Sequence, residues 1–159
     1  MPDSKSNAPF WTEDTRPRGE NFCRDRLIEH ISVNLPPSIQ LGRETSMPLD
    51  KRADIALTRN TMKLPVEIKG QWNRDVWNAV NDQLDARYTV DWQAEGRGVY
   101  IVLWFGDVPG QNLTKHPDGL EPPESPGELR NMLVDRLTEI QCVRIDVFVI
   151  DLSRPVGTV

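Results

Sequence analysis

Residues 52–69, RADIALTRNTMKLPVEIK, decide the fold of this chain. Two segments rich in β-forming residues, 52–58 and 64–69, lie on either side of the turn-like RNT at 59–61. Such runs joined by a short polar turn predict a β-hairpin. The hairpin supplies two adjacent strands, and the remaining elements are placed relative to them.

Hydrophobic spacing predicts the elements on both sides of the hairpin. Strands are expected where apolar residues alternate or run continuously, at 39–46, 98–105 and 143–152. Helices are expected where apolar residues recur every three or four positions, at 19–34, 74–90 and, after the capping box SPGE, 125–139. The order α-β-β-β-α-β-α-β predicts an α/β fold with one mixed central sheet flanked by helices.

Length and composition limit the domain organisation. The 159 residues suit one domain. We expect a mobile or loosely docked arm at 1–17 and a domain at 18–159, with a core at 18–105 and a C-terminal extension at 106–159 that begins with a loop rich in Pro and Gly. Neither a membrane span nor a signal peptide is indicated, so a cytoplasmic protein with no membrane partner is expected.

Charge and motif content exclude several classes of function. The net charge of −5 argues against a purely electrostatic nucleic-acid binder. The negative excess lies after residue 88, so an anionic ligand is expected to meet the first half of the chain. The motifs typical of serine hydrolases, zincins, NTPases and dinucleotide enzymes are absent. The class of function that remains is one based on carboxylate side chains and a metal ion.

The predicted hairpin carries charges where a sheet is normally apolar. Asp54 lies in its first strand, and Glu67 and Lys69 lie two residues apart in its second, so the last two point to the same face. Carboxylates that converge on a divalent cation are neutralised by it, and Asp54 and Glu67 are the hard ligands that Mg²⁺ prefers. Lys69 could hold a phosphate or the attacking water. The alternative is an exposed Glu67–Lys69 ion pair with a solvated Asp54.

The arrangement ADIAL, a short turn, PVEIK and then a helix bearing Gln resembles the PD-(D/E)xK nuclease superfamily, also called restriction endonuclease-like. That superfamily has a common α-β-β-β-α-β core, which matches the predicted order over residues 18–105. The resemblance implies a Mg²⁺-dependent nuclease that hydrolyses phosphodiester bonds, with DNA as the expected substrate and Mn²⁺ as a substitute metal. It implies metal ligands at Asp54, Glu67 and the carbonyl of Ile68, with Lys69 orienting or deprotonating the attacking water.

Two further positions match the resemblance. Glu20, in the RGE at the start of the first predicted helix, looks like the outer metal ligand of Holliday junction resolvases, with Glu29 as the competing choice. Gln83 is similar to the helix glutamine that many branches place beside the active site, where it helps position water or phosphate. Tyr88 lies five residues after Gln83 rather than the usual four, and Ala53 replaces the proline of the family name.

Three residues are candidates for contacts with nucleic acid. Trp72 and Arg74 follow the ExK strand directly, where Trp72 could stack on a base and Arg74 could pair with a phosphate. Arg87 lies four residues after Gln83, on the same helical face. The alternatives are a packing role for Trp72, a solvated Arg74 and a surface ion pair between Arg87 and Asp91.

The segments LPVEIKGQWNRDVWNAVNDQLDARY and GVYIVLWFG also resemble nuclease-like domains attached to large bacterial proteins, some of them thought to act in defence. This resemblance implies an effector domain attached to a larger protein. Several members of the nuclease superfamily work as dimers, so a homodimer is the other expected arrangement. Two rival hypotheses remain at this point. One is a catalytically silent nucleic-acid or protein binding module of the same fold, and the other is an unrelated α/β domain whose acidic second half binds a partner protein.

Overall fold

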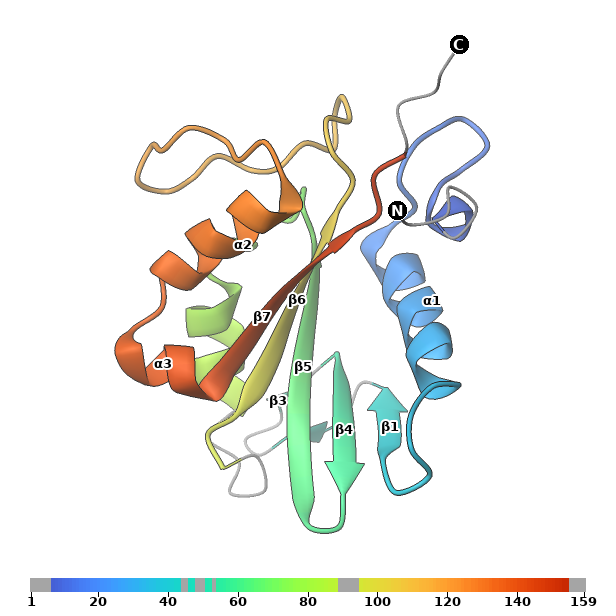
Figure 1. The fold of residues 1–159 in the computed structure, drawn as a ribbon, viewed down its shortest axis with the longest axis vertical. Helices are drawn as coiled ribbons and strands as arrows, with labels where there is room; N and C mark the ends of the chain where they lie inside the picture. Colours follow the sequence, from blue (N-terminus) through green and yellow to red (C-terminus); the bar gives the residue numbers. More distant parts are fainter. Residues whose placement is uncertain (1–6, 44–45, 48–50, 53, 89–94, 155–159) are drawn as a thin grey trace.

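The computed structural model describes residues 7–43, 46–47, 51–52, 54–88 and 95–154, without the side chains of 46–47, 51–52 and 85–88. The chain forms an α/β domain around a mixed five-stranded sheet (Figure 1). The sheet has the order β1-β4-β5-β6-β7, with bounds β1 (Gln40–Arg43), β4 (Ile55–Arg59), β5 (Met62–Gly70), β6 (Gly98–Trp104) and β7 (Ile145–Asp151). The helical elements are η1 (Ala8–Phe10), α1 (Glu20–Ser32), η3 (Val80–Tyr88), α2 (Pro126–Asp135) and α3 (Glu139–Arg144).

The strand pairing changes once across the sheet, from antiparallel to parallel at β5. β1, β4 and β5 are antiparallel, whereas β5, β6 and β7 run parallel. The predicted hairpin is β4–β5, and Asn60 adopts a positive φ of 53° in its turn, a conformation that Asn tolerates better than most residues. Parallel neighbours need long crossovers, which pass through η3 between β5 and β6 and through α2 and α3 between β6 and β7.

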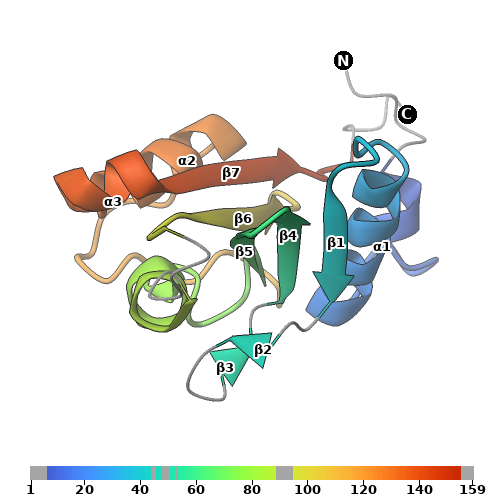
Figure 2. The ribbon, with the colours of Figure 1, turned by 90° about the horizontal axis from the view of Figure 1, so that it is seen from below.

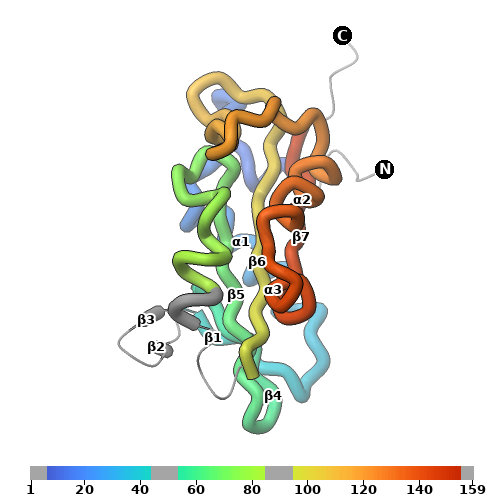
Figure 3. Tube along the Cα trace, turned by 90° about the vertical axis from the view of Figure 1, so that its left-hand side faces the viewer, coloured from blue at the N-terminus to red at the C-terminus, as the bar shows by residue number. Residues whose placement is uncertain are grey.

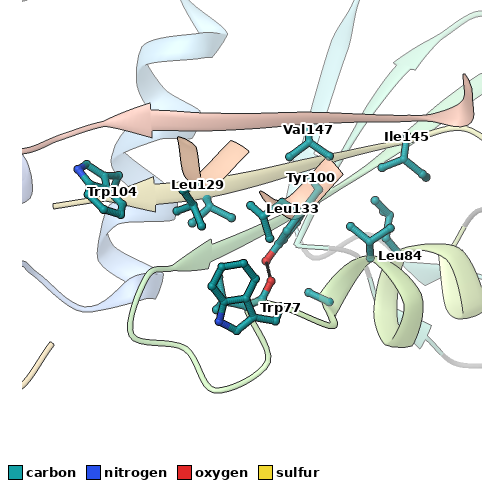
Figure 4. Close-up of a cluster of buried hydrophobic side chains, with 12 residues drawn as sticks. Trp77, Leu84, Tyr100, Trp104, Leu129, Leu133, Ile145 and Val147 are labelled. Carbon is teal, nitrogen blue, oxygen red and sulfur yellow. Dashed lines mark hydrogen bonds between the residues drawn. The ribbon is translucent and has the colours of Figure 1, made fainter. Parts of the chain in front are cut away.

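The sheet is covered on both faces. α1 lies on one face, and η3, α2 and α3 lie on the other (Figure 2). Alternate residues of the central strands therefore enter two separate cores. Val66 and Ile68 of β5 pack on the α1 side, whereas Tyr100 and Val102 of β6 pack on the η3 side, in the cluster that Figure 4 shows.

Three features differ from the sequence-based expectations. The expected helix at 74–90 begins with successive tight turns, in which Val76 N donates to Asn73 O and Asn78 N donates to Asp75 O, and continues as the π-helix η3. The expected helix at 125–139 ends at Asp135 and is followed by α3, which was not predicted. A small hairpin of β2 (Ser46–Met47) and β3 (Lys51–Arg52) was not predicted either.

The described part of the N-terminal segment packs more firmly than the expected arm. Trp11 is buried, and its indole Nε1 donates to Leu152 O at 2.9 Å, just beyond β7. An aromatic ring with a satisfied N–H stabilises such docking. The loop of residues 106–124 crosses the end of the molecule where β5, β6 and β7 finish (Figures 1 and 3). None of the helices in the described ranges is long and apolar enough to cross a membrane.

Candidate functional site

A buried ion pair lies near the carboxyl end of β5. Lys69 Nζ is 2.8 Å from Glu67 Oε1, and the two residues are only 8% and 3% exposed. Both side chains point to the η3 side because they alternate with Ile68 and lie in register with Tyr100 and Val102 of β6. The pair is therefore not the exposed ion pair of the alternative hypothesis. Its burial requires compensation of two charges that water would otherwise solvate.

Asp54 lies just before β4, at the edge of β5. Its Oδ2 accepts from Ile68 N at 2.9 Å, and its Oδ1 lies 3.5 Å from Nη1 of Arg24 on α1. This is possible because the ladder between β4 and β5 ends at Ile55 and Val66, so the Ile68 amide has no partner from β4 on this edge. The N–H and C=O of one strand residue point to the same edge, so the carbonyl of Ile68 faces the Asp54 side.

Glu20, the first residue of α1, occupies the next position along the same edge. Its Oε2 accepts from Gly70 N at 2.8 Å, and the side-chain amide of Asn73 donates to the same carboxylate. Glu29, the competing candidate, lies exposed and pairs with Arg26 at 3.1 Å. Of the two glutamates, Glu20 is the one that reaches β5.

The charges of this site influence one another. Burial, reinforced by the carboxylate of Asp54, raises the pKa of Glu67 from 4.5 to about 7 despite the attraction of Lys69. Burial by itself lowers the pKa of Lys69, but the carboxylates of Glu67, Glu20 and Asp54 together raise it above its ordinary value. Burial also raises the pKa of Tyr100 well above 10, with Glu67 as the next cause. Glu67 and Lys69 thus form a buried pair on which the negative charges of Asp54 and Glu20 also act.

The donor set has the chemistry of a site for a hard divalent cation. Three carboxylates, from Glu20, Asp54 and Glu67, and one backbone carbonyl provide only oxygen ligands, as Mg²⁺ prefers. The Lys69 ammonium already places a positive charge against Glu67. Within the described residues, no three acidic, histidine or cysteine side chains lie close enough to form a ready metal cluster. The donor atoms and the negative charges of these residues nevertheless suit a divalent cation.

Gln83 lies on η3, where its side chain is half-buried. Among the described side chains, no hydrogen bond joins Gln83 to Glu67 or Lys69. Asn81 accepts from Gln141 of α3 at 2.7 Å, so that flank of η3 faces α3. Residues two apart lie on opposite flanks of a helix, which places Gln83 on the flank away from α3.

The predicted nucleic-acid contacts have three different surroundings. Trp72 is half-buried and packs against Phe105, with ring centroids 5.4 Å apart, as in the packing alternative. The Arg74 side chain is 93% exposed, and its Nε lies 3.9 Å from Asp75 Oδ1. The side chain of Arg87 lies outside the described residues, as do Asp91 and the side chain of Tyr88.

Sequence reasoning missed the roles of two amides that follow β5. Gln71 is fully buried, where its Nε2 donates to Gly106 O and Gln111 O and its Oε1 accepts from Phe105 N. The Gln71 side chain thus connects the end of β5 by hydrogen bonds to the end of β6 and to the loop that follows β6. Asn73 holds Glu20. The sequence feature that could have indicated these roles is the polar segment GQWN at the end of a buried strand. Side-chain amides at such a place can hydrogen-bond the backbone N–H and C=O groups that have no strand partner.

Comparison with known families covers the part of the chain that holds this site. A family model described as "Domain of unknown function (DUF8371)" matches residues 3–107. The match extends from the N-terminal segment to just beyond β6 and includes Glu20, Asp54, Glu67, Lys69 and Asn73. The chain belongs to this family. Neither the search of curated proteins nor the search of solved structures found a match.

Proposed function

We propose that this DUF8371 domain is a metal-dependent nuclease that hydrolyses phosphodiester bonds of DNA and is built on a restriction endonuclease-like core. The observation that carries the proposal is the buried Glu67–Lys69 pair at the end of β5, beside two carboxylates held by backbone amides of the same strand. Charged side chains are rarely buried in the interior of a sheet, and buried charged groups are most frequent at functional sites.

The arrangement of elements supports the same proposal. α1 is followed by three antiparallel strands, β1, β4 and β5, then by η3 and the parallel strand β6. This is the α-β-β-β-α-β order of the superfamily that the sequence resembles. The small β2–β3 hairpin is an insertion in that order, and α2, α3 and β7 extend it.

In this proposal Mg²⁺, or Mn²⁺ in its place, is held by Asp54, Glu67 and the Ile68 carbonyl, with Glu20 in an outer position. A bound divalent cation supplies a water of lowered pKa and neutralises charge that develops on the phosphate. The backbone amides of Ile68 and Gly70 donate to the carboxylates of Asp54 and Glu20 and fix their positions at the strand edge. The chain thus arranges its acidic ligands before any metal arrives.

Lys69 acts as the positive group of the site in this proposal. An ammonium group has three N–H donors, and the contact with Glu67 uses one of them. The others can orient the attacking water or a phosphate oxygen. Gln83, on the flank of η3 away from α3, is proposed to help position the same groups.

Cutting assays test this function. Purified protein is incubated with supercoiled plasmid, linear duplex and single-stranded DNA in Mg²⁺, Mn²⁺ or EDTA. We expect metal-dependent cutting that falls by on the order of 10² or more in Glu67→Ala, as for other lost electrostatic stabilisers. Glu29→Ala is the matched control, because Glu29 is an exposed glutamate that pairs with Arg26 on its own helix.

Three outcomes separate the proposal from its rivals. Equal cutting by the parent and Glu67→Ala would assign the activity to a contaminant and overturn the proposal. DNA binding without cutting in any metal would instead indicate a binding module of the same fold. Absence of any response to metal or DNA would favour an unrelated α/β domain.

A further inference from the structure

The turn after β5 folds back on itself. Asn73 N donates to Gly70 O at 2.9 Å, which closes a four-residue β-turn. Trp72 lies directly over Gly70, because a Cβ at position 70 would come within 2.7 Å of the indole ring. Glycine at this position therefore allows the close approach that returns Asn73 toward the strand end.

The hydrogen bonds of Asn73 determine how its side chain is oriented. Asn73 Oδ1 accepts from Asp75 N at 2.9 Å, so the Nδ2 group faces the other way. Nδ2 lies 2.9 Å from Glu20 Oε2 and 3.2 Å from Glu20 Oε1. The contact with Asp75 N therefore fixes the orientation of the Asn73 amide, and its Nδ2 group donates to the Glu20 carboxylate.

Glu20 is consequently held by two donors on one of its oxygens. Oε2 accepts from both Gly70 N and Asn73 Nδ2, whereas among the described residues Oε1 takes only the longer contact with Asn73. Oε1 retains most of its accepting capacity, since a carboxylate oxygen has two lone pairs. The geometry presents Oε1 as the oxygen available for a further partner.

We infer that Asn73 is a positioning residue, which orients the Glu20 carboxylate so that Oε1 faces the divalent cation or a water bound to it. The inference rests on the proposed function, in which Glu20 is the outer metal ligand. Residues that orient metal ligands by hydrogen bonding change metal affinity or activity by about 10- to 100-fold when they are removed. Asn73 acts through Glu20 and touches no reacting group.

A double-mutant cycle between Asn73 and Glu20 tests the inference. The variants are Asn73→Ala, Glu20→Ala and the double variant. The readouts are the Mn²⁺ concentration needed for half of the thermal stabilisation and the rate of plasmid cutting. Asn112→Ala is the matched control, because Asn112 Oδ1 also accepts a backbone N–H within its loop, from Val108, and Asn112 is not part of the site.

We expect Asn73→Ala to weaken Mn²⁺ binding and to slow cutting by about tenfold each. In the Glu20→Ala background the same substitution should cause no further change in either readout, since its effect requires Glu20. A merely structural role would instead add the same loss in both backgrounds. Asn112→Ala should match the parent in both readouts.

Failure of the inference differs from failure of the proposed function. If the parent binds Mn²⁺ and cuts while Asn73→Ala equals the parent, or if the two substitutions add fully, the positioning role is overturned and the nuclease remains. If the parent neither binds Mn²⁺ nor cuts, the proposed function fails and the positioning role fails with it.

Discussion

Strands β5 and β6 lie side by side in parallel register, yet they fill the same face of the sheet with opposite chemistry. Glu67 is paired with Tyr100 and Lys69 with Val102, and all four residues are buried. Of the two β6 residues, only Tyr100 has a polar side-chain group, and its hydroxyl donates to Val76 O at 2.6 Å (Figure 4). On β5 the same layer holds an ion pair.

The difference supports the proposed role of β5. A buried ion pair contributes little to stability, and well-packed apolar residues in its place are often neutral or stabilising. β6 demonstrates that this layer of the sheet accommodates an aromatic ring and a valine. The charges of β5 are therefore better explained by chemistry at the strand end than by folding.

The largest expected effect comes from making β5 resemble β6. In the double variant Glu67→Leu/Lys69→Met, cutting should fall by on the order of 10² or more, because the acidic ligand and the ammonium are both lost. The free energy of unfolding should stay unchanged or rise by about 1–4 kcal/mol. Plasmid cutting and urea unfolding measure the two effects, and Tyr100→Phe on β6 is the control that should keep cutting.

Either of two results would contradict this interpretation of the β5 ion pair. A double variant that cuts as fast as the parent would remove the chemical role of the pair. A double variant that loses several kcal/mol of stability would show that the pair is kept for folding.

The next effect concerns one half of the pair. Lys69→Met leaves the Glu67 carboxylate buried without its counter-charge, so it should lower the free energy of unfolding by about 3–5 kcal/mol at pH 8. The loss should shrink at acidic pH, where Glu67 takes up a proton. Urea unfolding at pH 8 and pH 5 measures this, and equal losses at the two pH values would contradict it.

The smallest effect is the pH dependence that Glu67 imposes on stability. Its pKa is about 7 in the folded protein against an ordinary value of 4.5, so the folded state binds the proton more tightly. The contribution of Glu67 is therefore fully present below about pH 4.5 and is lost as the pH rises to about 7, with a total on the order of 3 kcal/mol.

Glu67→Gln removes this titrating group while keeping the shape of the side chain. The difference in unfolding free energy between the parent and Glu67→Gln should therefore decline between pH 4.5 and 7 and remain level above it. Urea unfolding across that range measures the difference. A difference that stays constant with pH would show that Glu67 titrates as an ordinary exposed carboxylate.

The sequence predicts the frame of this fold because its signals are local. The alternation and the polar turn of residues 52–69 predicted the β4–β5 hairpin, and the apolar run at 98–105 predicted β6. The spacing of Glu67 and Lys69 placed both on one face. Each of these predictions depends only on the pattern of residues within a short stretch of the sequence.

What the sequence did not predict depends on contacts between distant segments. The tight turns before η3 are held by Arg136 of the second crossover, which donates to Trp77 O and to Asn78 Oδ1. Docking of the N-terminal segment depends on Trp11 and Leu152, which are 141 residues apart. Side-chain hydrogen bonds of this kind leave no periodic pattern in the sequence.

The same limit applies to the candidate site. Composition did not reveal that η3 buries the face carrying Glu67, or that Asn73 reaches Glu20 across 53 residues of chain. Glu20 and Glu29 also could not be separated by spacing, since both lie in α1, and the contact of Glu20 with Gly70 N separates them.

Calorimetric titration of Mn²⁺ into the protein tests the central claim most directly, namely that the charges at the end of β5 serve a divalent cation. Asp54→Asn is the matched variant, since its amide oxygen can still accept from Ile68 N while the negative charge is removed. The account predicts saturable binding by the parent and binding weaker by about 100-fold in Asp54→Asn, because losing a ligand should cost no less than losing a residue that orients one. Equal binding by the two proteins, or no binding by the parent, would contradict it.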